Sequence, residues 1–257
     1  MINLYSKIVL EKQEQEDPWA ESLGIAERAV RNGITTFVNA PPFVIRGNGN
    51  STGLTVEDRE ELHCLLEEKN MKLTVLPGHC IRSRKRITDE EKEQQLLTVN
   101  GTSYVYVDLS GFSSAVFAKT LLDRLQKEGY HTVLIFPEFA PMFINNPGFL
   151  HYFVNRGAIS MLSAESILRI HGKDTQQLAM KFLQGNLAHV LSSSPRSALE
   201  PFRLKQAYDH IDLEFGTDWT EFLQTNTGQI IEDMPVVVYD PLPMPQKGKK
   251  LFPWGKG

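Results

Sequence analysis

The residues whose side chains could take part in catalysis or binding stand at the ends of apolar segments. Cys80 directly follows His79, which brings a thiol next to an imidazole, the combination that activates nucleophilic cysteines. Adjacent residues of an extended chain point to opposite sides, so these two side chains do not face each other. We therefore interpret Cys80 as a small apolar filler and His79 as a hydrogen-bonded rim residue.

Other polar groups follow further apolar segments, but their types do not match a common catalytic set. The segment ends carry no histidine pair, no paired carboxylates at metal-ligand spacing and no glycine-rich phosphate loop. These ends are Tyr5, Lys7, residues 40–43, residues 78–80, Asp108, residues 136–139 and residues 192–196. On residue type alone, we expect little metal or phosphate chemistry there.

Strand-like and helix-like segments alternate along the chain and must position these residues. Helices are predicted over residues 19–32, 55–70, 89–97, 113–129, 148–155, 174–183 and 197–215. About seven strands, each followed by a helix, predict an α/β fold whose parallel sheet closes into a (β/α) barrel, with a doubly wound open sheet as the alternative. In either fold, functional residues gather at the carboxyl ends of the strands.

The first predicted strand, MINLYSKIVL, has one apolar and one polar face. Its polar residues Asn3, Tyr5 and Lys7 alternate with apolar ones, as in a strand with one buried side. The polar face is therefore expected to meet either water or a lined cavity.

Composition narrows the class of protein further. With 257 residues, 41% of them hydrophobic, the chain can bury the core of a single domain. A net charge of −4 gives no overall attraction to nucleic acid, and the basic run at residues 82–86 is interpreted as a solvated loop. No apolar run is long enough for a bilayer, and two cysteines, Cys64 and Cys80, suit a reducing compartment. We expect a cytoplasmic protein.

Several longer segments resemble the bacterial capsular-polysaccharide tyrosine phosphatases of the polymerase and histidinol phosphatase (PHP) superfamily. The similarity runs through GIAERAVRNGITTFVNAPP, VLPGHCIR, QLLTVNGTSYVYVDL, LQKEGYHTVLIFPE and NNPGFLHYFVNRGAISMLSAESILRIHGK, and reaches the closing KKLFPW. It covers nearly the whole chain. The resemblance implies a PHP-type distorted (β/α)7 barrel as a single domain over residues 1–240, followed by a Pro- and Lys-rich tail over residues 241–257.

The resemblance also places the family's early metal-ligand motifs on positions of this chain. The initial Asp-x-His-x-His motif falls on Asn3, Tyr5 and Lys7, and the acidic pair that follows falls near Gln13 and Glu14. The Thr-Pro-His-His motif reads Ala-Pro-Pro-Phe here. Most of the expected early ligands are therefore replaced.

The later motifs are altered as well. Cys80 stands at the bridging glutamate of the Gly-Gln-Glu-Ile-Arg motif, while Arg82 is kept. Asp108 preserves a carboxylate at the end of a Tyr-rich strand. The His-Pro-Glu-Arg motif keeps Glu138 but has phenylalanine for both its histidine and its arginine, and the final Ser-Asp-Ala-His motif ends on Arg196.

Seven of nine ligand positions implied by the resemblance are thus substituted, and only Glu14 and Asp108 keep anionic oxygens. The family is implied to use manganese to generate a hydroxide nucleophile, whereas Lys7 and Arg196 bring positive charge to that place. We therefore expect no cofactor. Lys7 and Arg196 are predicted to neutralise the two carboxylates or, with Arg82, to attract an anion such as a phosphate.

Two functions follow from the resemblance. One is a catalytically inactive pseudophosphatase that binds a bacterial tyrosine kinase, its tyrosine-rich tail or polysaccharide-assembly proteins; the other is an active phosphotyrosine phosphatase with a rebuilt site. The resemblance also implies a homo-oligomer, and we expect neither nucleic-acid binding nor membrane insertion. The candidates for the vestigial pocket or an anion site are Tyr5, Lys7, Glu14, Cys80, Arg82, Asp108, Glu138 and Arg196.

Overall fold

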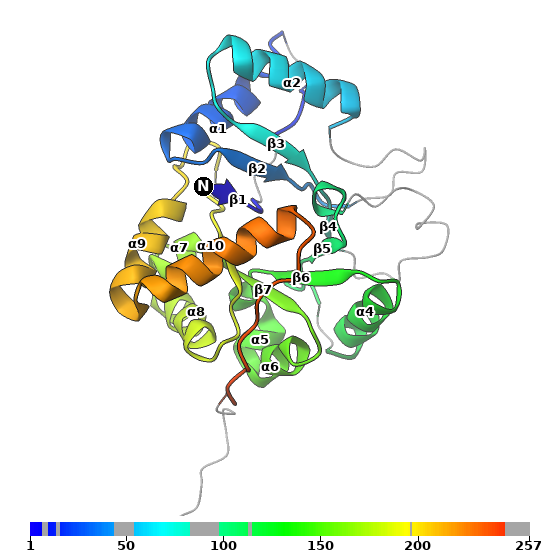
Figure 1. Ribbon diagram of the computed structural model, residues 1–257, viewed down its shortest axis with the longest axis vertical. Coiled ribbons are helices and arrows are strands. Elements are labelled where there is room, and N and C mark those ends of the chain that lie inside the picture. The colour runs from blue at the N-terminus through cyan, green and yellow to red at the C-terminus, as the bar shows by residue number, and fades with distance from the viewer. Residues whose placement is uncertain are drawn as a thin grey trace, which may run out of the picture.

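The computed structural model describes residues 1–6, 10–13, 16–43, 54–82, 98–112, 115–195 and 197–244. Within these ranges, parallel strands alternate with helices along the chain (Figure 1). The predicted α/β class is therefore confirmed. The predicted helix over residues 89–97 lies outside the described residues.

The first sheet has the order β1-β2-β3, with β1 at Ile2–Asn3, β2 at Thr36–Asn39 and β3 at Thr74–Pro77. Helices α1 (Ala20–Arg31) and α2 (Val56–Glu68) connect these strands and cover the side of the sheet that faces away from the second sheet (Figure 1). The capping box predicted before α2 forms through Thr55 and Asp58, which satisfies backbone N–H groups at the helix start.

The second sheet has the order β4-β5-β6-β7-β8 and is also parallel. Its helices pack buried apolar faces against the strands, as amphipathic patterns predict. Its strands are β4 (Cys80–Ile81), β5 (Tyr104–Val107), β6 (His131–Ile135), β7 (Ile159–Ser163) and β8 (Val190–Ser192). Its helices are α4 (Ala115–Lys127), α5 (Pro141–Asn145), α6 (Gly148–Val154), α7 (Ala164–Ile167) and α8 (Lys173–Gln184).

Hydrogen bonds join the two sheets at both sides. Cys80 N donates to Pro41 O over 2.9 Å at the carboxyl end of β2. At the other side, Ser193 N donates to Asn3 Oδ1 over 2.8 Å, and Tyr5 N donates to Ser192 Oγ over 2.9 Å. The strands therefore surround one shared interior, with β3 and β4 separated only by a two-residue break. This arrangement agrees with the predicted distorted barrel, although the strands form two hydrogen-bonded sheets rather than one.

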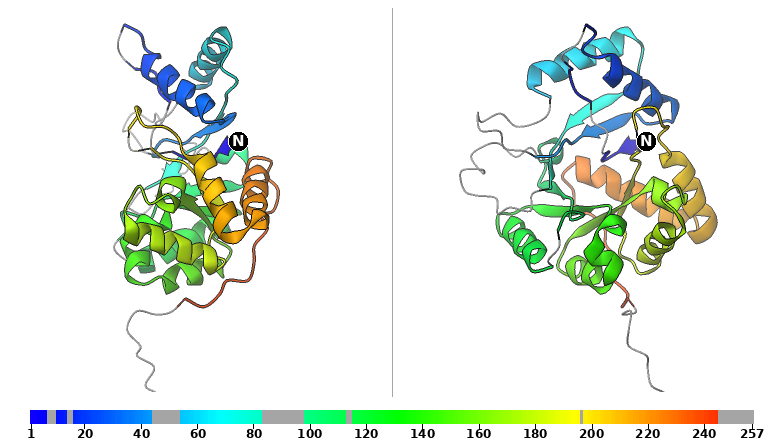
Figure 2. Two further views of the ribbon diagram at one scale, coloured as in Figure 1. Left: turned by 90° about the vertical axis from the view of Figure 1, so that its left-hand side faces the viewer. Right: turned by 180° about the vertical axis from the view of Figure 1, so that it is seen from behind.

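Two further helices follow β8, namely α9 (Leu204–Phe215) and α10 (Thr217–Ile231). The helix predicted over residues 197–215 begins seven residues later than expected, because Pro201 interrupts its start. The sequence did not predict α10, whose threonine, asparagine and glycine residues are weak helix formers. Packing against the amino ends of the strands stabilises it instead (Figures 1 and 2).

The segment 233–244, which we call the C-terminal strap, runs without regular secondary structure along the amino ends of the strands. Asp233 Oδ1 accepts from Ser103 N over 2.8 Å, and Met234 O accepts from the Tyr104 hydroxyl over 2.6 Å. Farther along, Leu242 N donates to Gly185 O over 2.9 Å. The described part of the predicted tail is therefore bound to the barrel; the predicted domain boundary at residue 240 stays a prediction.

A buried histidine at the amino end of β8 makes stability depend on pH. His189 Nδ1 accepts from Ser160 N over 3.0 Å, and its Nε2 has no hydrogen-bond partner among the described residues. Burial lowers the pKa of His189 to about 4. Protonating Nδ1 would break the bond from Ser160, so the folded state holds the neutral ring.

Because unfolded His189 binds a proton near pH 6.5 and the folded residue only near pH 4, acid favours the unfolded chain between these values. We expect its contribution to the free energy of unfolding, about 3 kcal/mol, to be present above pH 6.5 and lost as the pH falls to about 4. Urea unfolding of the wild type and His189→Leu at several pH values measures this difference. Parallel stability curves over that range contradict it.

Candidate functional site

Five of the predicted site and motif positions converge at the carboxyl ends of the strands. Tyr5 follows β1, Arg82 follows β4, Asp108 follows β5 and Phe136 follows β6, while Cys80 in β4 pairs with Tyr106 near the carboxyl end of β5. This end is where α/β barrels place their functional residues, and we call it the mouth.

Aromatic side chains fill the interior below the mouth. The Tyr5 ring packs edge-to-face on Tyr106, with ring centres 5.7 Å apart, and on Phe136, with centres 5.6 Å apart. All three residues are at most 2% exposed. The described residues of the first strand's polar face, Asn3 and Tyr5, are thus buried, and Tyr5 contributes a ring to a packed core rather than a ligand to an open cavity.

Above this aromatic cluster, Arg82 links two polar residues. Its Nη2 donates a hydrogen bond to the Tyr5 hydroxyl. Its Nε lies 3.3 Å from Asp108 Oδ2, close enough for an ion pair although not aligned as a hydrogen bond. Asp108 is only 6% exposed, so the guanidinium supplies the positive charge that a buried carboxylate needs. Arg82 is therefore a neutralising partner of Asp108 among the described residues.

Cys80 is unsuited to act as a nucleophile. The side chain is fully buried and hydrogen-bonds with the Tyr5 hydroxyl. Burial raises the pKa of its thiol to about 12, so the thiol stays protonated at neutral pH. Burial likewise raises the pKa of Tyr5 far above its ordinary value. The interpretation of Cys80 as an apolar filler agrees with this environment.

Phe136 holds an unusual backbone conformation. Its φ of 46° and ψ of 59° lie in the left-handed region, which is costly for a residue with a bulky side chain. This conformation turns the chain from β6 into a 3-10 turn over Pro137–Phe139. Such strain persists only where surrounding structure enforces it, and it is commonest at functional positions. The backbone at Phe136 thus has the strained conformation that is common at functional sites. Its side chain, a phenyl ring, has no group that could bind a metal or a phosphate.

Glu138 lies apart from the Arg82 pair, on the neighbouring strand ends. Its Oε1 accepts from Ser163 N over 2.8 Å, and the residue is 1% exposed. Beside it, the sequence analysis missed Glu165, which is equally buried and accepts hydrogen bonds from Ser163, Ser193 and Ser194. The only signal for Glu165 was a carboxylate three residues after the apolar segment that ends at Leu162. Its bonds hold the ends of β7 and β8 together.

The remaining predicted site residues are not all placed. Lys7, Glu14 and Arg196 lie outside the described residues, so their proposed pairing stays a prediction. The interpretation of His79 as a rim residue is wrong, because His79 is 1% exposed and packs against Phe43 with ring centres 5.4 Å apart. Its burial follows from its place in the short break between β3 and β4.

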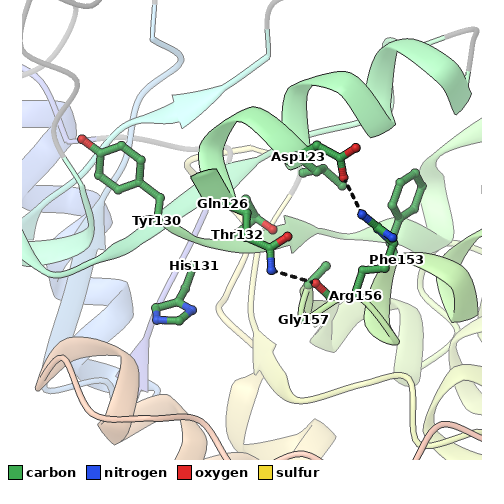
Figure 3. Close-up of a pocket in the computed structure, with 10 residues that line it drawn as sticks. Asp123, Gln126, Tyr130, His131, Thr132, Phe153, Arg156 and Gly157 are labelled. Atoms are coloured by element: carbon green, nitrogen blue, oxygen red, sulfur yellow. Dashed lines mark hydrogen bonds and ion pairs between the residues drawn. The ribbon is translucent and has the colours of Figure 1, made fainter. Parts of the chain in front are cut away.

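A small cavity lies at the opposite end of the barrel, where β6 and β7 begin (Figure 3). Asp123 and Arg156 form an ion pair of 3.2 Å beside it, and Gln126 Nε2 donates to Arg156 O. Its volume of about 30 Å³ suits a single water molecule and not an aromatic phosphate. The mouth therefore remains the candidate functional site.

The similarity suspected from the motifs extends through the whole barrel. The sequence profile of the family described as capsular polysaccharide synthesis, CpsB/CapC, matches residues 1–232. The chain belongs to the CpsB/CapC family. The resemblance drawn from its motifs is thereby confirmed.

Named CpsB/CapC relatives are tyrosine phosphatases. The tyrosine-protein phosphatase YwqE of Bacillus subtilis is 27% identical over 253 residues, which span 98% of this chain and 99% of the relative. The putative tyrosine-protein phosphatase CapC of Staphylococcus aureus is 24% identical over 81% of this chain and 82% of its own.

A solved structure matches the fold over nearly the whole chain. It comes from a crystallographic description of YwqE from Bacillus subtilis and CpsB from Streptococcus pneumoniae as unique metal-dependent tyrosine phosphatases. The TM-score is 0.83 at 25% identity, covering 95% of this chain and all of the solved chain. This finding contradicts the expectation of no cofactor, because these CpsB/CapC relatives depend on a metal.

The described residues at the mouth nevertheless do not fit a metal cluster. Nowhere in the described ranges do three His, Cys, Asp or Glu side chains group so that they could hold an ion. At the mouth, Asp108 is paired with Arg82, Cys80 keeps its proton, and the Tyr5 and Phe136 rings are packed together. A metal bound by this chain would need ligands from residues beyond the described ranges.

Among described helices, none is long and apolar enough to cross a membrane.

Proposed function

We propose that this CpsB/CapC protein is a pseudophosphatase: it keeps the family's barrel and binds a capsule-synthesis partner without hydrolysing phosphotyrosine. The relatives' named activity supplies the chemical class of the partner, a tyrosine-bearing protein segment. A bacterial tyrosine kinase with a tyrosine-rich tail is such a partner. Binding would then shield the tail from other proteins or compete with them for it.

The aromatic cluster of Tyr5, Tyr106 and Phe136 carries this proposal. Phosphoryl transfer needs charge stabilisation and a positioned nucleophile, and both must reach the phosphorus. Aromatic rings provide neither. The rings of Tyr5 and Phe136 stand at positions to which the resemblance assigns ligands, and their edge-to-face packing fills the interior there. The nearest described cation, Arg82, already contacts Tyr5 and Asp108.

Hydrolysis of a phosphotyrosyl peptide tests the proposal directly. We expect no turnover above a protein-free control, with or without added manganese, while Bacillus subtilis YwqE under the same conditions hydrolyses the peptide. Manganese is included because the relatives are metal-dependent. Metal-dependent turnover by this chain within about 10³-fold of YwqE contradicts the pseudophosphatase proposal.

Binding is measured separately by calorimetry with the tyrosyl and phosphotyrosyl forms of the same peptide. Heat that saturates with either form supports a binding role. Failure of both forms to bind at millimolar concentration removes the kinase tail as the partner, whatever the hydrolysis assay shows.

The rival function is an active phosphatase with a rebuilt site. Arg86 follows Cys80 after five intervening residues, the spacing of the phosphate loop in cysteine-dependent tyrosine phosphatases. The burial of Cys80 and the raised pKa of its thiol oppose this function. Metal-independent turnover that Cys80→Ser abolishes would establish it.

A further inference from the structure

A groove between α8 and α9 lies on the outside of the barrel, away from the mouth. It encloses about 500 Å³ and is open to solvent. Its walls include Gln177, Met180, Lys181 and Gln184 from α8, and His210 and Glu214 from α9. Two neighbouring helices thus leave a channel between them that the described chain does not fill.

The C-terminal strap leads the chain to one end of this groove. Leu242 N donates to Gly185 O over 2.9 Å, and Gly185 directly follows the groove residue Gln184. Met244 Sδ lies only 3.1 Å from the position that a Cβ on Gly185 would occupy. The residues after Met244 therefore start beside the groove.

Residues 245–257 have the charge to match this surface. They carry four lysines and no acidic residue. The segment 204–231, which forms α9 and α10, carries a single lysine, Lys205, against five carboxylates. These carboxylates are all exposed: Asp209, Asp212, Glu214, Asp218 and Glu221. Lys181 balances Glu214 within the groove lining, so the attraction comes from the carboxylates of α9 and α10 outside that lining.

Apolar groups match as well. Leu213 is 85% exposed and stands next to the groove residue Glu214 in sequence, outside the groove lining itself. Met180 provides an apolar group on the α8 side. The sequence after Met244 carries Leu251, Phe252 and Trp254, which gain from covering such surface.

The length of the segment is sufficient. Thirteen extended residues reach at most about 43 Å, whereas the twelve-residue helix α8 is about 18 Å long. We propose that residues 245–257 dock into the groove between α8 and α9 of the same chain. Lysines then face the acidic helices, and Leu251, Phe252 and Trp254 cover Met180 and Leu213.

Limited trypsin digestion of the full-length chain tests the docking, because trypsin cleaves after the lysines at positions 247, 249 and 250. We expect Leu213→Asn, which removes an apolar contact without adding a negative charge that would attract the tail lysines, to speed cleavage at these lysines at least tenfold, as followed by mass spectrometry. Phe252→Asp should do the same, and the double variant should be no faster than either. High salt should also speed cleavage of the wild type.

Leu199→Asn is the matched control, because Leu199 is an 83%-exposed leucine that neither lines the groove nor neighbours a lining residue in sequence. We expect it to be cleaved at the wild-type rate. Equal rates for the wild type and Leu213→Asn overturn the proposal, as does equal acceleration by Leu199→Asn. A wild-type rate that falls with rising protein concentration overturns docking within one chain and assigns the groove to the tail of a second copy.

Discussion

Replacing Phe136 by alanine is expected to lower the free energy of unfolding by about 3 to 5 kcal/mol. The ring is 2% exposed and packs against both Tyr5 and Phe139, so its removal leaves a cavity in the aromatic cluster. Two edge-to-face contacts are lost in addition to the buried apolar surface. Urea or thermal unfolding measures the effect.

The backbone of Phe136 makes this prediction sharper. Glycine adopts the left-handed region without the cost that alanine meets there, so we expect Phe136→Gly to be more stable than Phe136→Ala by about 1 kcal/mol. At Phe222, which is 8% exposed inside α10, the order should reverse, because glycine destabilises a helix interior relative to alanine. The same order at both positions contradicts the strained conformation of Phe136.

The second large effect is expected from breaking the pair between Arg82 and Asp108. Arg82→Met keeps much of the apolar stem but leaves Asp108 buried without its cation. We expect a loss of about 2 to 3 kcal/mol, below the range for fully buried pairs because the Arg82 side chain is one-third exposed.

A double-mutant cycle with Asp108→Asn isolates the interaction. The double variant should be more stable than the sum of the two single losses predicts, by at least about 1 kcal/mol, because an uncharged partner no longer needs the guanidinium. Additive losses, or a single loss at Arg82→Met below about 0.5 kcal/mol, contradict a stabilising pair. Unfolding curves of the four proteins supply these values.

Most of the barrel could be predicted from periodicity. Strands such as Tyr104–Val107 and helices such as Ala115–Lys127 are bounded by turn residues and show regular apolar spacing, so their positions follow from local physics. Helix α10 escaped prediction because its stability comes from contacts with β8 and the strap rather than from its own sequence.

The candidate site was predictable as a set of strand ends but not as a set of interactions. The alternation of polar and apolar residues left the face of Tyr5 toward either water or a lined cavity, and the structure shows that its ring is buried. Sequence could not show that Arg82 reaches both Tyr5 and Asp108, since these residues are brought together only by the sheet. The left-handed backbone of Phe136 also leaves no local signal, because phenylalanine is a poor residue for that conformation.

The hydrogen bonds between β1 and the end of β8 constrain how the chain folds. Asn3 and Ser193 are separated by 190 positions, so their contact forms only after nearly the whole barrel has been synthesised. Contacts of such long sequence separation slow folding. Until then, β1 presents an unpaired strand edge, the kind of surface through which nascent chains associate with one another. We therefore expect the contact between β1 and the end of β8 to form late in folding.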